Sequence, residues 1–434
     1  MSISKKYLTN RVTGELGEAS AIYFPSTFDE VKSVVKMIHQ NKQELITIGG
    51  HTGLSGATFP DNKQVLMSLE KLNRIISLDT ETLTLTVEAG VTIAQIAEFL
   101  ADTPFFYAPD PGSKAASIGG NAATNAGGMR AVKYGVTRDN IRAMRVLLAD
   151  GQAMQVGSIN RKDSSGYDLK DIFIGSEGTL GVITELDLKI QPKPKYQREI
   201  LLGFDDLTQL SPNIFTILST GLVPATLEFF ERDSIAYSER GLKLTFPDID
   251  GQAFLLITLD GNVAEQLDAE IAYLKTLSPH ALVLTDEVTR QTMWQLRGAI
   301  VSSVEQESLQ EPLDVVVPVN KIASTIIELK ALAISEGLSA IFFGHAGDGN
   351  IHANIIKGDL SDDEWEVKLS HYLDQLYALI AKVGGKPSAE HGIGILKKPY
   401  FEKYIAEAEL STMKAIKQAL DPDNLLNPGK IFDL

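Results

Sequence analysis

Residues 344–354 read GHAGDGNIHAN, and runs of apolar residues lead into and out of this stretch. Two buried strands on either side of a tight turn have this pattern, and Asp348-Gly349 predicts a two-residue type I′ turn between them. In that register His345 lies directly opposite His352, so the two imidazoles are close enough to share one cation. From the hairpin alone, a pair of structural histidines within a sheet is the alternative interpretation.

A third metal ligand is offered farther along the chain, where residues 389–394 read AEHGIG. Glu390 together with His345 and His352 makes a set of two histidines and one carboxylate, which is typical of a catalytic divalent metal site with an open position. Asn354 lies two residues after His352 and therefore faces the same side of the predicted strand. The sequence predicts a metal centre built on this hairpin.

Composition places the chain among ordinary folded proteins. Its 434 residues are enough for two or three domains with large cores, and 44% of them are hydrophobic and 22% charged. The net charge of −16 argues against nucleic acid as a partner. The chain has no cysteine, which excludes disulfides, thiolate zinc sites and iron–sulfur clusters held by four cysteines. Without a leader-like N-terminus or a run of about 18 apolar residues, we expect a cytoplasmic protein with no integral membrane segment.

Three segments in the first half of the chain are rich in glycine and other small residues. The first, residues 49–56, reads GGHTGLSG and follows a buried strand predicted at residues 45–48, and the others span residues 109–128 and 174–184. Backbone N–H groups in such loops can approach phosphate oxygens closely. Each segment alone is also compatible with an ordinary turn, in which Glu177 is a solvated acid, and none matches the Rossmann or P-loop fingerprint. Together they favour a flat, phosphate-bearing ligand.

The chain changes character at residues 191–195, whose sequence QPKPK predicts a linker. Beyond it, predicted strands alternate with longer helices, one of which spans residues 287–306 and carries Arg297. This pattern indicates an α+β domain with a mostly antiparallel sheet.

With these motifs in order, the sequence resembles the FAD-linked oxidoreductases of the vanillyl-alcohol oxidase and p-cresol methylhydroxylase superfamily. Within it, the sequence is most similar to the branch of D-lactate dehydrogenase, the FAD subunit of glycolate oxidase and D-2-hydroxyglutarate dehydrogenase. The resemblance spans nearly the whole chain and rests on residues 49–56, 109–128, 175–181, 344–354, 389–394 and 427–430. It implies an α+β protein with a PCMH-type FAD-binding domain of two α/β subdomains and an α+β cap domain. The expected boundaries are 1–192 for the FAD-binding domain, 193–384 for the substrate or cap domain, and 385–434 for a segment that returns to the FAD domain.

The resemblance also implies a role for individual residues. The positions of the family's metal ligands correspond to His345, His352 and Glu390, and the expected metal is zinc, manganese or iron. The positions that contact the substrate correspond to Arg297 and Asn354, and the position of the catalytic base corresponds to His391. The residues that match contacts to FAD are Gly49, Gly50, His51, Thr52, Gly53, Leu54, Ser55, Pro109, Ser113, Gly119, Gly120, Asn121, Thr124, Asn125, Gly127, Gly128, Glu177, Gly178, Gly181, Val182, Ile183 and Asn427.

The reaction that the resemblance implies is oxidation of a D-2-hydroxy acid to the 2-oxo acid, by hydride transfer to FAD with help from a divalent metal. The chemistry of the residues agrees, because an arginine can bind a carboxylate through two hydrogen bonds and a cation lowers the pKa of a hydroxyl group that it touches. Pro312 stands where members that act on dicarboxylic acids carry a lysine. We therefore expect a monocarboxylate such as lactate or glycolate rather than 2-hydroxyglutarate.

Several features leave alternatives open. His51 stands where many members of the branch have asparagine or glycine, and other branches bind the flavin covalently through a histidine at this place. Non-covalent FAD is expected, with a covalent bond through His51 as the alternative. The alternative functions are a non-redox transferase of the alkyl-dihydroxyacetone-phosphate synthase type, a flavin subunit that is active only in a multi-subunit oxidase, and a D-2-hydroxyglutarate dehydrogenase. The expected electron acceptor is a quinone, an electron-transfer flavoprotein or oxygen, and a homodimer is compatible with the sequence.

Overall fold

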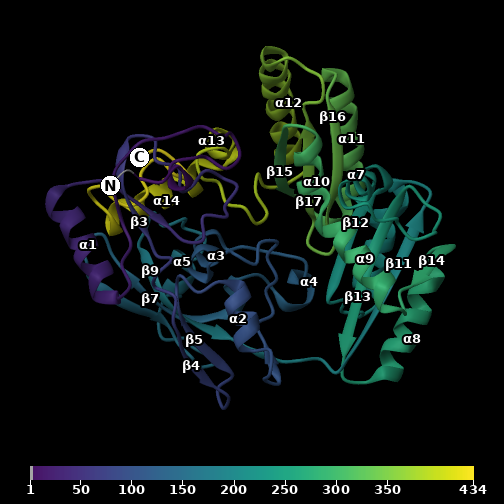
Figure 1. Cartoon of the computed structure of the whole chain (residues 1–434), viewed down its shortest axis with the longest axis horizontal. Helices are drawn as coiled ribbons and strands as arrows, with labels where there is room; N and C mark the ends of the chain where they lie inside the picture. Colours follow the sequence, from purple (N-terminus) through teal and green to yellow (C-terminus); the bar gives the residue numbers. More distant parts are fainter. Residues whose placement is uncertain (1–2) are drawn as a thin grey trace. The chain divides into compact units, whose positions relative to one another are not determined.

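The computed structural model describes residues 3–434, which form two compact units (Figure 1). The first unit comprises the described chain up to Gly128, together with Gly135–Lys193 and Glu390–Leu434. The second unit comprises Met129–Tyr134 and Pro194–Ala389. Each unit is therefore assembled from segments that are distant in sequence.

A small parallel sheet begins the first unit. Its strands lie in the order β1 (Ala19–Tyr23), β3 (Lys63–Ser68) and β2 (Leu45–Ile48). Helix α1 (Phe28–Asn41) begins after Thr27, whose side chain accepts a hydrogen bond from a first-turn N–H and so caps the helix. The apolar stripe of α1 packs into the core of the unit. Strand β2 has the predicted bounds and leads directly into the first glycine-rich loop.

A five-stranded antiparallel sheet forms the other part of the first unit, in the order β4-β5-β9-β7-β8. Its strands are β4 (Ile75–Asp79), β5 (Thr84–Glu88), β7 (Ile141–Leu147), β8 (Ala153–Gly157) and β9 (Val182–Lys189). The remaining elements of the unit include α2 (Ile93–Phe99), β6 (Phe105–Phe106), α3 (Ile118–Thr124), α5 (Leu169–Phe173), β10 (Gln191–Pro192), α13 (Lys398–Tyr404) and α14 (Glu407–Leu420).

The C-terminal segment is a structural part of the first unit. The Leu45 N–H of β2 donates to the Leu425 carbonyl at 2.7 Å. Lys417 on α14 is 2% exposed, pairs with the buried Asp421 carboxylate and donates to the Thr179 carbonyl at 2.7 Å. A buried ammonium group is tolerated when its hydrogen bonds are satisfied, as they are here. These contacts fasten the last part of the chain to the unit that begins it.

The second unit is built on a seven-stranded sheet in which every pairing is antiparallel, which confirms the predicted mostly antiparallel sheet. The strand order is β14-β11-β13-β12-β16-β17-β15. The strands are β11 (Tyr196–Phe204), β12 (Thr226–Glu231), β13 (Ala253–Gly261), β14 (His280–Val283), β15 (Gln310–Val316), β16 (Ser339–His345) and β17 (Asn350–Ile356). The helices are α4 (Ala131–Tyr134), α6 (Leu210–Ser219), α7 (Arg232–Leu242), α8 (Ala264–Leu274), α9 (Glu287–Gly298), α10 (Ile300–Glu307), α11 (Ile322–Glu336) and α12 (Asp362–Lys382).

The predicted hairpin is formed by β16 and β17, but its predicted register is wrong. The loop has four residues instead of two, and His345 pairs with Asn350 while His352 pairs with Phe343. A type I′ turn needs positive φ at both central residues, whereas only Gly349 of the predicted pair has it, at 77°. The strands have slipped by two residues, which keeps every side chain on its predicted face.

The helices of the second unit differ from the prediction in two places. The single helix expected at 287–306 is divided into α9 and α10, because the chain leaves the helical conformation at Ala299, with φ −93° and ψ 0°. The poor helix former Gly298 directly precedes this break. Helix α7 was not predicted, and it follows β12 without a separating loop.

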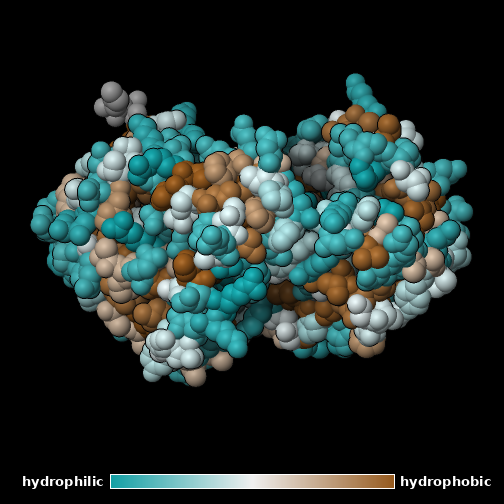
Figure 2. Space-filling model, turned by 90° about the horizontal axis from the view of Figure 1, so that it is seen from below, coloured by the Kyte–Doolittle hydropathy of each residue, from teal (hydrophilic) through white to brown (hydrophobic). Residues whose placement is uncertain are grey.

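The surface seen in Figure 2 carries hydrophilic residues interspersed with smaller hydrophobic patches, as is usual for folded proteins. Among the described residues 3–434, no helix combines the length and the apolar character needed to cross a bilayer.

Candidate active site

Two of the three predicted metal ligands come together in the second unit. His345 on β16 and His352 on β17 lie on the same face of the sheet, with ring centroids 5.1 Å apart. Their Nε2 atoms are 3.4 Å apart. Two metal–nitrogen bonds of about 2.0–2.1 Å at a tetrahedral angle hold their nitrogen atoms roughly 3.4 Å apart. The geometry of the two imidazoles therefore fits a shared divalent cation.

Each of these histidines has a buried carboxylate beside its other ring nitrogen. Glu228 Oε1 lies 2.7 Å from His345 Nδ1, and Asp314 Oδ1 lies 4.0 Å from His352 Nδ1. Both carboxylates are fully buried. Histidines that bind metals usually donate their second ring N–H to such a partner, which fixes the tautomer that offers the other nitrogen to the metal. The surroundings of the pair thus also fit a metal site.

The two carboxylates were not among the predicted site residues. Burial alone would raise the pKa of Glu228, but the charges of His345 and Arg297 outweigh it and hold the pKa below its usual value. Asp314 accepts hydrogen bonds from the Asn350 side chain at 2.9 Å and from the Ser388 hydroxyl at 2.9 Å. The signal in the sequence is an acidic residue inside an apolar strand run, which is costly unless the carboxylate has partners.

Arg297 reaches the same face of the sheet from α9. It is 6% exposed, and its Nη2 pairs with Glu228 Oε2 at 2.6 Å. The guanidinium also lies 4.9 Å from the ring centroid of Phe343. Its Nε–H is buried and has no hydrogen-bond partner among the described residues. Arg297 therefore has donor capacity left for an acidic ligand.

The predicted substrate residue Asn354 is also buried in the second unit. It lies two residues after His352 on β17, and its side-chain amide donates to the Gln310 carbonyl oxygen. Asn354 pairs directly with Pro312 of the neighbouring strand β15. Side chains at such opposite positions are neighbours on one face of a sheet.

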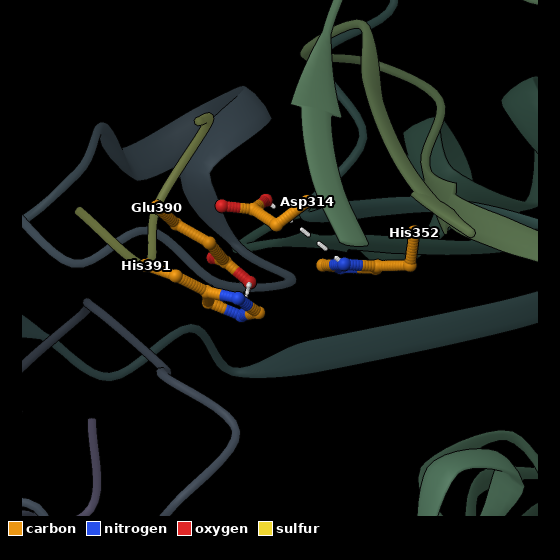
Figure 3. Close-up of side chains that lie close together, drawn as sticks. All are labelled: Asp314, His352, Glu390 and His391. Carbon is orange, nitrogen blue, oxygen red and sulfur yellow. Dashed lines mark ion pairs between the residues drawn. The ribbon is translucent and has the colours of Figure 1, made fainter. Parts of the chain in front are cut away.

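Glu390 and His391 belong to the first unit, in the segment that follows Ala389. Their side chains converge, with Glu390 Oε1 3.8 Å from His391 Nε2, and a dashed line marks this pair in Figure 3. A second dashed line in the figure marks the Asp314–His352 pair of the second unit. Ala389, the last residue of the second unit, donates its N–H to Asp314 Oδ2 at 3.1 Å. Asp314 thus anchors the chain one peptide bond before Glu390.

The first unit contains a cavity walled by the three glycine-rich segments. Gly50 N–H donates to Ser117 Oγ at 2.9 Å, which joins the first loop to the start of α3. A Cβ atom on Gly49 would lie only 2.3 Å from the same oxygen, so this close approach requires glycine. Backbone and small side chains dominate the walls, and such walls fit a flat, phosphate-bearing cofactor such as FAD.

Most of the predicted FAD-contact residues line this cavity. Those that do are Gly49, Gly50, His51, Thr52, Gly53, Ser55, Gly119, Gly120, Asn121, Thr124, Glu177, Gly178, Gly181, Val182, Ile183 and Asn427. Those outside its lining are Leu54, Pro109, Ser113, Asn125, Gly127 and Gly128. Lining residues that were not predicted are Thr47, Ala57, Thr58, Leu69, Ala89, Ala116, Ser117 and Ala123. Ser117 directly precedes α3 and caps it, and serine is a typical N-cap residue, but no helix was predicted after it.

Glu177 is a buried, hydrogen-bonded residue of the cavity wall. The alternative interpretation, in which Glu177 is a solvated acid in a turn, is therefore wrong. The residue is 4% exposed, and its carboxylate accepts hydrogen bonds from the Ile393 N–H at 2.6 Å and the Gly394 N–H at 2.8 Å. Its carbonyl accepts a hydrogen bond from the Asn427 side chain at 2.7 Å. Glu177 therefore joins the cavity to the segment that carries His391.

His51 lies on the cavity in a left-handed backbone conformation, with φ 55°. Its Nδ1 is 3.2 Å from the Thr58 hydroxyl. Burial lowers the pKa of His51, and the positive charges of Arg11 and Lys6 lower it further. The imidazole is therefore held neutral near pH 7.

Comparisons with known proteins agree with this geometry. Residues 193–431 match the family model of the C-terminal domain of FAD linked oxidases, and residues 19–157 match the model of an FAD binding domain. A D-lactate dehydrogenase of Anaerostipes hadrus is 38% identical over 414 residues, covering 93% of this chain and 87% of that protein. A glycolate oxidase subunit GlcD of Bacillus subtilis is 32% identical, covering 95% and 88%. A D-2-hydroxyglutarate dehydrogenase of Stutzerimonas stutzeri is 31% identical, covering 95% and 91%.

The fold is shared with more distant solved structures. A 4-ethylphenol oxidase from Gulosibacter chungangensis matches with a TM-score of 0.77 and 18% identity, covering 99% of this chain and 92% of that one. At this level of identity, the likeness shows that the two chains share a fold. With both domain models matched and relatives aligned along nearly its whole length, the chain belongs to the FAD-linked oxidase family.

Proposed function

We propose that this protein oxidises a D-2-hydroxy monocarboxylic acid, such as lactate or glycolate, to the 2-oxo acid with FAD and a divalent metal. The observation that carries the proposal is the pair of imidazole nitrogens 3.4 Å apart, beside a buried arginine with an unsatisfied N–H. The relatives named D-lactate dehydrogenase and glycolate oxidase subunit support the substrate class.

The protein residues have the following proposed roles. Arg297 binds the substrate carboxylate, and Asn354 contacts the substrate. His391 takes the proton of the 2-hydroxyl group as general base. FAD, when bound along the glycine-rich cavity, supplies the acceptor for the hydride from C2. A zinc, manganese or iron ion held by His345, His352 and Glu390 would lower the pKa of the hydroxyl group.

The preference for a monocarboxylate rests on Pro312. It lies directly opposite Asn354 and has no polar group with which to bind a second carboxylate. D-2-hydroxyglutarate is therefore the less favoured substrate, although one relative carries the name of its dehydrogenase.

The proposal is tested by anaerobic reduction of the purified flavoprotein. D-lactate, L-lactate, glycolate, D-2-hydroxyglutarate and malate are added separately, before and after chelation, and the visible flavin absorbance is followed. We expect D-lactate or glycolate to bleach the flavin, with loss of the reaction on chelation and recovery on adding metal. Bleaching by none of these acids would contradict the proposal, and unchanged bleaching after verified metal removal would contradict the metal's role.

We propose further that the FAD is bound non-covalently. His51 Nδ1 already lies beside the Thr58 hydroxyl, a contact that needs no bond to the flavin. Acid denaturation followed by centrifugation should leave all the yellow colour in the supernatant. Colour that stays with the precipitated protein and is lost in a His51→Ala variant would show a covalent bond instead.

A second candidate function is that of a flavin subunit in a larger oxidase, and the name of the relative GlcD as a glycolate oxidase subunit favours it. The same reduction assay separates the candidates, because a dependent subunit would reduce its flavin only after a partner is added. The proposed electron acceptors, a quinone, an electron-transfer flavoprotein or oxygen, are distinguished by which of them reoxidises the reduced protein.

A further inference from the structure

Glu228 is, like Asp314, a fully buried acidic group on the second unit's sheet. It stands in the run Thr226–Glu231 of β12, and it is 0% exposed. Its strand pairs with β16 so that Glu228 lies directly opposite His345. A carboxylate in this position is costly to bury, so its contacts must compensate the loss of hydration.

The two oxygens of Glu228 have different partners. Oε1 lies 2.7 Å from His345 Nδ1, and Oε2 accepts a hydrogen bond from Arg297 Nη2 at 2.6 Å. One partner is a proposed metal ligand and the other is the proposed carboxylate-binding residue. A single side chain therefore joins the two parts of the proposed substrate site.

The contact with His345 decides which ring nitrogen faces the neighbouring histidine. A carboxylate oxygen only accepts hydrogen bonds, so Nδ1 carries the proton and Nε2 presents its lone pair. That Nε2 is the atom 3.4 Å from His352 Nε2. An amide at position 228 would not fix this arrangement, because it can also present N–H groups to the ring or to Arg297.

We propose that Glu228 is a positioning residue that orients His345 toward the cation and holds Arg297 for the substrate carboxylate. This inference rests on the proposed function, since it assigns Glu228 to the same site. The alternative is a purely structural ion pair, which would stabilise the fold without affecting metal or substrate affinity.

The test uses the full-length, FAD-loaded protein and the variant Glu228→Gln. Each protein is stripped of metal, and its affinity for Zn²⁺ and Mn²⁺ is measured by competition with a chromophoric chelator. Loss of such a second partner typically weakens metal binding about 10- to 100-fold, and we expect a loss of this size. At saturating metal, kcat should recover substantially while KM for the hydroxy acid stays raised, because Arg297 lacks its fixed partner.

The matched control is Glu231→Gln, which makes the same chemical change on the same strand. Glu231 is 8% exposed and pairs with Lys330. The control should lower thermal stability without changing metal affinity or KM. If Glu228→Gln does not fold, Glu228→Asp keeps the charge but is too short to reach both partners, and it should show the same two defects in milder form.

The outcomes separate this inference from the proposed function. Wild-type metal affinity and KM in a folded Glu228 variant, or an equal metal loss in Glu231→Gln, would overturn the positioning role and leave the proposed function standing. A wild-type protein that binds no metal and oxidises hydroxy acids unchanged after chelation would overturn the metal part of the proposed function, and the inference with it.

Discussion

The carboxyl group of Glu177 is held in a place where its charge is poorly hydrated. Burial raises its pKa from 4.5 to about 7, although the N–H groups of Ile393 and Gly394 and the charge of Lys397 act in the opposite direction. The folded protein therefore keeps a proton on Glu177 at pH values at which the unfolded chain has lost it. Stability falls as the pH rises from about 4.5 to about 7, and the loss is complete above that window.

We predict that Glu177→Gln removes this part of the pH dependence. A shift from 4.5 to about 7 corresponds to roughly 3 kcal/mol of unfolding free energy. Urea denaturation of both proteins at several pH values across this window gives the measurement. The wild type should lose stability more steeply than the variant, and parallel curves would show that the carboxyl group is not protonated in the folded state.

Arg297→Lys tests the carboxylate-binding role at the scale of one side chain. Lysine keeps the charge but loses the planar fork that can hold a carboxylate through two hydrogen bonds. Hydrogen bonds to charged groups contribute about 1.5–3 kcal/mol, so kcat/KM for the hydroxy acid should fall about 10- to 100-fold. Steady-state kinetics measure the change, with most of it expected in KM.

The control for this variant is Arg290→Lys on the same helix. Arg290 pairs with Glu287 one turn earlier, on the surface of α9. Its replacement should leave kcat/KM unchanged. Equal losses in the two variants would point to damage of the helix instead of the loss of a substrate contact.

At the scale of the element, strand β15 carries a prediction about substrate choice. One face of β15 carries the side chains of Gln310, Pro312 and Asp314, because alternate residues of a strand point to the same side. On this face Pro312 is opposite Asn354. Pro312→Lys would place an ammonium group on that face beside Asn354. We predict that the variant gains activity toward D-2-hydroxyglutarate relative to D-lactate, because a second carboxylate then has a partner.

The ratio of kcat/KM for the two substrates measures this change. Pro312→Gln is a suitable control, since it adds a long polar side chain without the positive charge. A shift of the ratio in the glutamine variant as large as in the lysine variant would contradict the electrostatic explanation.

The elements also show how far the sequence could be interpreted. Strand β2 was predicted with its observed bounds, because a short apolar run that ends in glycine has few other conformations. For the hairpin, the predicted side-chain faces were right and the predicted register was wrong. The Asp348-Gly349 pair suggested a two-residue turn, but the Ala346 N–H donates a hydrogen bond to the Leu227 carbonyl of another strand. Such tertiary hydrogen bonds leave no periodic signal. Glu228 was missed for the same reason, because its partners come from α9 and β16.

At the scale of the whole molecule, the first unit depends on the end of the chain. Lys417 is buried with Asp421 and the Thr179 carbonyl. We predict that Lys417→Met destabilises the protein by about 3–5 kcal/mol, because it leaves the Asp421 charge buried without its cation. The variant should also release FAD more readily, since the Asn427 side chain of the same segment lines the cavity.

Chemical denaturation and flavin release on dilution measure the two effects. Lys414→Met on the same helix, closer to the surface, serves as the control and should change both quantities little. A Lys417 variant with wild-type stability and flavin retention would show that the C-terminal segment is not needed to hold the first unit together.

Strand β15 is one of the two edge strands of the seven-stranded sheet, and its outer side has a consequence for self-association. Val316 exchanges both backbone hydrogen bonds with Lys386, and the Asp314 carbonyl accepts from the Ala389 N–H. Alternate residues of a strand direct their backbone groups to the same side, so the backbone nitrogen of Pro312 also points outward, where it has no hydrogen to donate. A β-strand from another molecule would find part of this edge occupied and part of it without a donor. The sheet is thus protected from growing into intermolecular β-aggregates along β15.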